Sequence, residues 1–194
     1  MTIKISNTAA IHITDYFIET GIINAKDQAS YIYCFEYAID TILFPLTLLV
    51  FGIIFNRFIP SFLFCIIIIP LKMMVGGAHA STRIRCSIIS YTLFIVTLFN
   101  YKLLNIFPLT FLAICYIMCC TIVVLLSPVD HKNNRLSYAI KSKLKKLCFS
   151  FLCFISILYA LFIYNEMPQY YLMINACLLI VPTNQIIGKL TNFR

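Results

Sequence analysis

Long apolar runs separated by short polar segments constrain the fold of this chain more than any other feature. In lipid the backbone N–H and C=O groups must bond within their own segment, so such runs are expected to be helices. Several are shorter than the ~20 residues that a straight span needs, and neighbouring polar residues must then complete the helix. The sequence therefore predicts an all-α polytopic membrane protein with about six transmembrane helices. The predicted spans are at about residues 41–56, 58–75, 87–101, 106–126, 147–164 and 169–187.

Composition supports the membrane class and limits the choice of partners. Hydrophobic residues make up 61% of the chain and charged residues 11%, and the mean hydropathy is +0.92. These values lie far from the soluble average. A net charge of +8 would suggest nucleic acid for a soluble protein. In a membrane protein it indicates basic cytoplasmic loops and attraction to anionic lipid. We therefore expect a lipid bilayer as partner and no nucleic acid.

The N-terminal segment is less apolar than the remainder of the chain. Within residues 1–39, Ala10, Ile13 and Phe17 recur at helical spacing opposite Thr14, which predicts an amphipathic, cytoplasmic or interfacial helix. Gly21 is expected to end this helix, and Asn24 to cap the next. Residues 40–194 are expected to form the six-helix transmembrane domain. It includes a polar catalytic island at 72–86 and a basic cytoplasmic loop at 128–146.

The distribution of basic residues predicts the orientation in the membrane. If both termini are cytoplasmic, 13 of the 15 Lys and Arg residues lie on the inner side, and only Arg57 and Lys102 lie on the outer side. This asymmetry follows the positive-inside rule. It places the polar island at the cytoplasmic face.

The polar island combines groups that can activate a thiol. His79 can act as a base for Cys86, while Arg83 and Arg85 supply positive charge. On one unbroken helix, His79 and Cys86 would lie about 10.5 Å apart along the axis, so a non-helical break is expected between them. Gly76 and Gly77 permit such a break, which would leave Cys86 near the start of a helix, where the helix dipole favours a thiolate. Alternatively, the arginines are membrane anchors and Cys86 is a packing residue.

The island and a downstream segment resemble the accessory gene regulator B family of membrane cysteine endopeptidases. Gly76-Gly77-Ala78-His79-Ala80 and Cys86 match the family's Gly-Gly-x-His-Ala motif with its later cysteine, and the segment from Ser127 to Leu136 is similar to the family's Pro-Val-(Asp or Glu) segment. Two departures are that only Lys72 remains of the basic run before the glycines, and that Ala78 replaces a common aromatic residue.

The resemblance implies a quorum-sensing role in a bacterial cell membrane. A short amphipathic pro-peptide would lose its acidic C-terminal tail, with Cys86 as nucleophile and His79 as base, and an acyl-thioester on Cys86 would let the peptide close a thiolactone or lactone ring. The resemblance also implies a homodimer. A non-catalytic transporter, or a binding partner of a sensor kinase, is the alternative.

Further residues are assigned by chemistry alone. Asp130 is the best candidate to orient His79, although a carboxylate that caps the Pro128 turn is the simpler interpretation. Basic residues of the 128–146 loop either anchor the protein to lipid or bind an acidic peptide. They are Lys132, Arg135, Lys141, Lys143, Lys145 and Lys146. The nine cysteines include no C-x-x-C pair, and no H-E-x-x-H motif occurs, so neither a metal nor another cofactor is expected.

Overall fold

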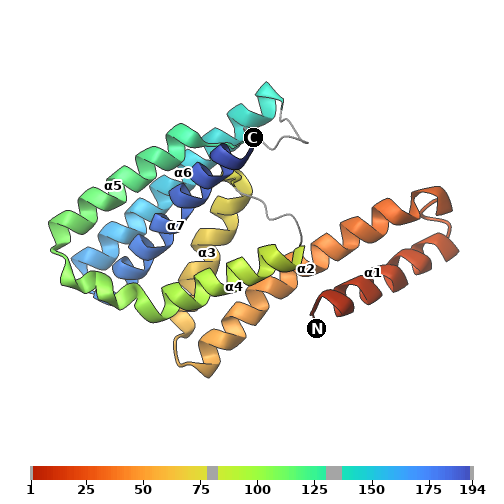
Figure 1. Ribbon diagram of the computed structural model, residues 1–194, viewed down its shortest axis with the longest axis horizontal. Helices are drawn as coiled ribbons and strands as arrows, with labels where there is room; N and C mark the ends of the chain where they lie inside the picture. Colours follow the sequence, from red (N-terminus) through yellow and green to blue (C-terminus); the bar gives the residue numbers. More distant parts are fainter. Residues whose placement is uncertain (1, 78–82, 130–136, 193–194) are drawn as a thin grey trace. The chain divides into compact units, whose positions relative to one another are not determined.

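The structure is a computed structural model that describes residues 2–77, 83–129 and 137–192. Within these ranges the regular elements are helices, and none is a strand, which confirms the predicted all-α class. The elements are shown in Figure 1. In order they are α1 (Thr2–Glu19), the 3₁₀ helix η1 (Ala25–Asp27), α2 (Gln28–Ile54), α3 (Phe58–Val75), α4 (Arg83–Asn100), the 3₁₀ helix η2 (Tyr101–Ile106), α5 (Leu109–Leu126), α6 (Tyr138–Tyr164) and α7 (Pro168–Asn192).

In the part of the chain that the structure describes, six segments are long and apolar enough to cross a membrane, as predicted, and the chain is a multi-pass membrane protein. Two helices begin well before the predicted spans: α2 begins at Gln28 and not near residue 41, and α6 begins at Tyr138 and not near residue 147. At α6 the reason is visible in the sequence before the apolar run. The hydroxyl of Ser137 caps this helix by accepting a hydrogen bond from the N–H of Ile140 at 3.5 Å. Lysine is a good helix former, so the basic run continues the helix. The second half of the expected 128–146 loop is therefore helical.

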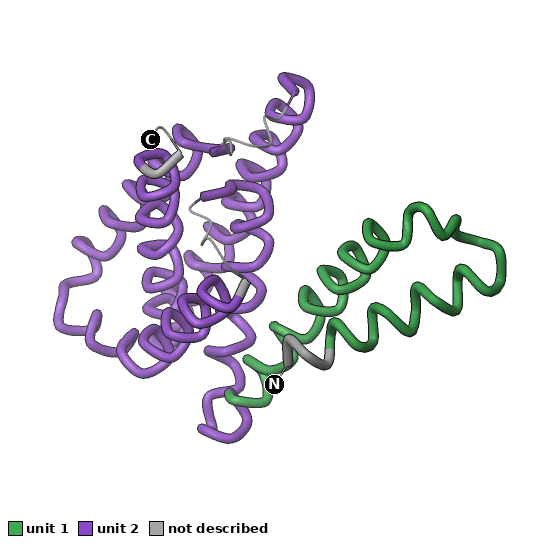
Figure 2. Tube along the Cα trace, turned by 45° about the vertical axis from the view of Figure 1, so that its right-hand side comes forward, with its two compact units in different colours: residues 1–51 green, residues 52–194 purple. Residues whose placement is uncertain are grey.

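The chain divides into two compact units, residues 1–51 and 52–194, which Figure 2 colours separately. In the first unit, the ring of Phe17 stacks on that of Phe35 in α2, with centroids 5.7 Å apart. The expected apolar face of α1 is wrong at two positions, because Thr14 is buried whereas Ile13 is exposed. Thr14 can be buried because its hydroxyl donates to the carbonyl of Ala10 at 2.8 Å.

The turn after α1 follows the predicted break but not the predicted cap. Helix α1 ends at Glu19, and Gly21 has a φ of +76°, a conformation that favours glycine. Asn24 occupies the N-cap position of η1, but its side chain makes no capping hydrogen bond.

Helix α7 forms the centre of the second unit. It packs most extensively against α3 and α5, and it also contacts α6. Its side chains at Met173, Ile174, Cys177 and Leu178 are fully buried. An apolar helix surrounded by other helices has such a core-facing side along its length.

Polar side chains also join the helices of this core. The hydroxyls of Tyr116 in α5 and Ser156 in α6 share a hydrogen bond of 2.8 Å. The ring of Tyr159 stacks on that of Tyr116 with centroids 4.2 Å apart, and its hydroxyl accepts a bond of 2.8 Å from the amide of Asn175 in α7. Hydrogen bonds of this kind hold transmembrane helices together.

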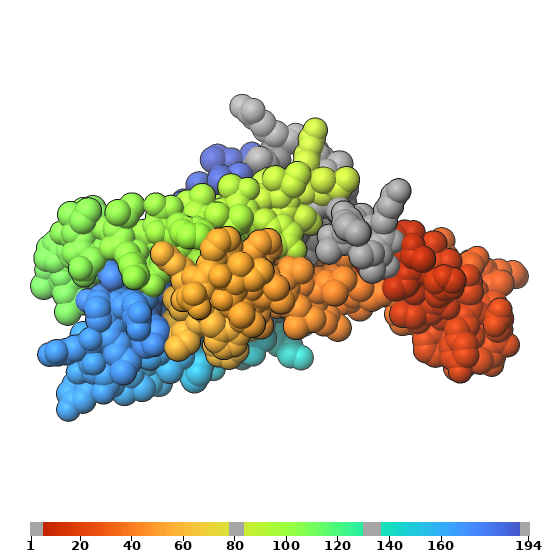
Figure 3. All heavy atoms as spheres, turned by 90° about the horizontal axis from the view of Figure 1, so that it is seen from below, coloured from red at the N-terminus to blue at the C-terminus, as the bar shows by residue number. Residues whose placement is uncertain are grey.

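The turns of the second unit gather at its two ends. At one end are the α2–α3 turn, η2 and the α6–α7 turn. Figure 3 shows this end, with the α2–α3 turn in orange beside the green segment that contains η2 and the blue segment that begins α7. At the other end are the last turns of α3, α5 and α7, and this is where the candidate site lies.

Candidate functional site

Helix α3 stops at the two glycines because their backbone leaves the helical conformation. Gly76 has φ +69° and ψ −162°, a region that is essentially restricted to glycine, and Gly77 has φ +150°. The N–H of Gly76 still donates to the carbonyl of Lys72 at 3.2 Å, which closes the last turn of α3. The predicted helix break at these glycines is confirmed.

The break brings together the two segments that carry the sequence motifs. The N–H of Val129, just after α5, donates to the carbonyl of Val75 at 2.8 Å. A Cβ atom on Gly76 would lie 2.7 Å from the carbonyl oxygen of Val129. Glycine is therefore required at position 76 both by its own conformation and by the close approach of this second segment.

Helix α7 also contributes a residue to this site, and the sequence analysis did not include it. The side-chain amide of Asn184 lies against the α-carbon of Gly77, so close that a Cβ at this position would collide with it. The sequence signal for the involvement of α7 is the run Thr183-Asn184-Gln185, a polar triplet inside an otherwise apolar span. An ionisable or amide group at such a depth is a functional candidate.

Two polar side-chain atoms close in the sequence to Asn184 and Val129 are buried. Gln185 is fully buried, and its amide nitrogen donates to the carbonyl of Val123 at 3.4 Å. Among the described residues, its Oε1 and the Oγ of Ser127 have no hydrogen-bond partner. Buried polar atoms normally have a hydrogen-bond partner. The presence of these two unpartnered atoms next to Gly77 and Val129 distinguishes this end of the unit from the opposite end.

Cys86 lies in the first turn of α4, where the sequence placed it, and its side chain is half-buried. Residues spaced four apart share one face of a helix, so Cys86 is on the face that continues through Ser90 to the fully buried Phe94. The ammonium group of Lys72, one turn before Gly76, donates to the hydroxyl of Ser90 at 3.4 Å. The thiol is therefore on the inward side of α4, one turn from a contact with the last turns of α3.

The other predicted site residues divide into described and undescribed positions. Arg83 begins α4, and Arg85 is an exposed residue of its first turn. The side chain of Arg83 and the residues His79, Asp130, Lys132 and Arg135 lie outside the part that the structure describes.

The four lysines of α6 divide between two faces. The buried face of α6 runs through Cys148, Leu152, Ile155 and Tyr159. Lys141 and Lys145 precede Cys148 by seven and three residues and share its face, whereas Lys143 and Lys146 lie on the opposite side of the helix. By helical spacing only the first pair shares this face. Lys141 is half-buried, whereas Lys145 is exposed, as are Lys143 and Lys146.

This arrangement offers a nucleophile and hydrogen-bonding groups at one end of a helical bundle. The thiol of Cys86 lies at a helix N-terminus, where unpaired backbone N–H groups stabilise negative charge. Lys72, Ser90 and Asn184 add polar groups from three different helices. His79 belongs to the segment between α3 and α4, which lies outside the described residues.

Comparison with known proteins identifies the family. The family model described as accessory gene regulator B matches residues 10–187, nearly the whole chain. No curated protein and no solved structure matches the chain. The matched range includes the glycine pair, Cys86, the Ser127–Val129 segment and Asn184. The chain therefore belongs to the accessory gene regulator B family and is associated with accessory gene regulator quorum sensing.

Proposed function

We propose that this protein is a membrane cysteine endopeptidase that removes the C-terminal tail of a short quorum-sensing pro-peptide. One observation carries the proposal: the thiol of Cys86 is on the inward face at the N-terminus of α4, next to the Lys72–Ser90 contact. Eight other cysteines are present, but this one follows the glycine break of the motif and begins a helix. Nucleophilic attack requires a thiolate, and His79 of the same motif is the base proposed to form it.

The proposed reaction has two steps. In the first, His79 accepts the proton of the Cys86 thiol, the sulfur attacks the scissile carbonyl carbon, and the peptide C–N bond breaks. His79 returns the proton to the leaving amine, and the N-terminal part of the peptide remains as a thioester on Cys86. In the second, a thiol or hydroxyl of the bound peptide attacks the thioester and closes a thiolactone or lactone ring, while Cys86 recovers its proton through His79.

Orientation and assembly are part of the same proposal. The positive-inside asymmetry supports cytoplasmic termini and a cytoplasmic site, because the end of the second unit with Gly76 carries Lys72, Arg85 and the four lysines of α6, whereas Arg57 and Lys102 are at the other end. The substrate is proposed to be an amphipathic pro-peptide with an acidic tail. The working unit is proposed to be a homodimer.

The decisive experiment is to trap the acyl-enzyme. Purified protein in liposomes is mixed with a synthetic precursor and quenched in acid, and the intact mass is measured. We expect an adduct with the mass of the N-terminal fragment that hydroxylamine removes, because hydroxylamine cleaves thioesters. Cys86→Ala should abolish the adduct and cleavage, and His79→Ala should slow cleavage roughly a hundredfold to ten-thousandfold.

The matched control uses the remaining cysteines. A variant in which the other eight are replaced by Ala should retain cleavage and the adduct. Four of these eight, Cys65, Cys119, Cys148 and Cys177, are buried, so the unfolding temperature of this variant is measured alongside. Cleavage by a folded Cys86→Ala protein would overturn the assignment of Cys86 as the nucleophile. Failure of the folded wild-type protein to cleave the precursor would support the non-catalytic alternative.

A further inference from the structure

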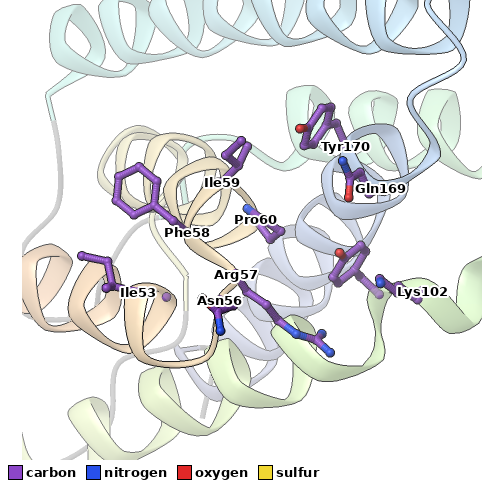
Figure 4. Close-up of a pocket in the computed structure, with 11 residues that line it drawn as sticks. Ile53, Asn56, Arg57, Phe58, Ile59, Pro60, Lys102, Gln169 and Tyr170 are labelled. Carbon is purple, nitrogen blue, oxygen red and sulfur yellow. The ribbon is translucent and has the colours of Figure 1, made fainter.

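A cavity of about 480 Å³ opens at the end of the second unit that lies opposite Gly76 (Figure 4). Three segments form it: the α2–α3 turn, η2 and the first residues of α7. Its volume is within the range of small-molecule sites, which is ~300–1,000 Å³. The catalytic proposal makes no use of this cavity.

The cavity is lined by the two basic residues that the positive-inside rule assigns to the outer side of the membrane. Arg57 and Lys102 both line it, and its eleven lining residues include no carboxylate. Glu166 is in the neighbouring α6–α7 turn but does not line it. Asn56, Tyr101, Gln169 and Tyr170 add polar groups to the wall. Such a surface selects an anion with several oxygen acceptors.

Arg57 is held in place before any ligand binds. Its Nη1 donates to the carbonyl of Leu98 at 2.5 Å, and its guanidinium carbon lies 4.9 Å from the centroid of the Phe99 ring. Figure 4 shows Arg57 and Lys102 on different segments, with Gln169 and Tyr170 on a third. A guanidinium has five N–H donors in a fixed planar fork, a geometry that suits phosphate oxygens.

The location of the cavity indicates the source of the phosphate. The cavity lies where candidate spans end, at Ile54, Phe58, Ile106 and Pro168, and the ends of spans lie at the headgroup level of a bilayer. Tyr101 and Tyr170 fit the tyrosine enrichment at that level. Phe58 and Ile59 also line the cavity, and both are exposed on the side of α3. An apolar rim next to a cationic wall matches a phospholipid with its headgroup inside and its acyl chains outside.

We propose that this cavity binds the phosphate-bearing headgroup of a membrane phospholipid through Arg57 and Lys102. The site is independent of the thiol chemistry at the opposite end. It would anchor the α2–α3 turn, η2 and the start of α7 to the headgroup layer.

Binding of phosphatidylglycerol to the full-length protein in neutral detergent tests the proposal, with native mass spectrometry as readout. Lys102→Gln should raise the apparent Kd about tenfold, the effect of losing one charged hydrogen bond. The matched control is Lys143→Gln, which removes the same charge at the other end and should leave the Kd within about twofold. Equal weakening in both variants would reveal nonspecific attraction and overturn the proposal.

Two further arms complete the test. Gln169→Ala changes an exposed neutral residue and should weaken binding severalfold, so it carries the test if Lys102→Gln fails to fold. Competition by glycerol 3-phosphate then distinguishes a phospholipid from a soluble phosphate ester as the ligand. Weak competition supports a lipid, whereas competition at the affinity of the lipid itself assigns the site to a soluble phosphate ester and overturns the lipid proposal. Absence of binding by either probe also overturns it.

Discussion

The N–H of Val129 donates a hydrogen bond of 2.8 Å to the carbonyl of Val75, and this bond joins two segments that are more than fifty residues apart. Val75 ends α3 just before the glycine pair, and Val129 follows the Ser127-Pro128 turn after α5. The two motif segments therefore form one backbone structure. The approach is close enough that it leaves no room for a side chain on Gly76.

The first prediction concerns the two glycines. Gly76→Ala and Gly77→Ala should each lower cleavage activity and destabilise the fold by about 1–3 kcal/mol, because both positions have backbone conformations that other residues avoid. Adding Asn184→Ala should partly restore Gly77→Ala, since the obstacle there is a side chain. It should not restore Gly76→Ala, whose obstacle is the backbone oxygen of Val129. Cleavage rates and unfolding temperatures in detergent provide the measurement. Equal recovery of both variants would contradict this account.

The second prediction distinguishes the two faces of α6. Lys141→Gln with Lys145→Gln should raise KM for an acidic-tailed precursor about two- to tenfold and reduce its salt dependence, with little change in kcat, because these residues share the helix face that carries the buried Cys148. Lys143→Gln with Lys146→Gln removes the same charge from the outer face and should leave KM within about twofold. Neutral liposomes are used so that lipid attraction does not contribute. Equal changes in both pairs would indicate general electrostatic attraction, and no change in either would leave only lipid anchoring.

The third prediction is the orientation in the membrane. In the variant that lacks all native cysteines except Cys86, reporter cysteines are placed at Leu103 and Glu166 for one end of the second unit, and at Ser81 and Lys143 for the other. A membrane-impermeant maleimide applied to intact cells should label the first two and not the last two. The two ends of a span are separated by ~30 Å of hydrocarbon, so the result is unambiguous. External labelling of Ser81→Cys would place the proposed site outside the cytoplasm.

The fourth prediction concerns the polar contacts of the core. Tyr159→Phe removes the acceptor of the Asn175 amide and should lower the free energy of unfolding by about 0.5–2 kcal/mol, the range for hydrogen bonds between transmembrane helices. Tyr138→Phe, at a position that is 88% exposed, is the control and should be neutral. A double-mutant cycle with Asn175→Ala isolates the pair. A coupling energy near zero would show that this hydrogen bond makes no net contribution to stability.

The sequence alone determined the all-α class, the six spans and the break at Gly76. These follow from local properties: apolar length sets where a helix can cross a membrane, and two adjacent glycines allow the backbone to leave the helix. The position of Cys86 near a helix start followed for the same reason, because seven residues of helix would separate it too far from His79. The start of α6 did not follow, because hydropathy locates the apolar run and cannot show that a capped, lysine-rich helix precedes it.

Only the tertiary structure decided which groups meet. Asn184 reaches Gly77 across more than a hundred residues, and Arg57 and Lys102 line one cavity although they belong to different turns. The packing of α1 likewise buried Thr14 and exposed Ile13, against the apolar pattern. Periodicity gives the faces of each helix, but the rotation and crossing of each helix against its neighbours are set by side-chain packing between segments that are distant in sequence. Which lysines of α6 share the face of Cys148 can be stated only when the buried face of that helix is known.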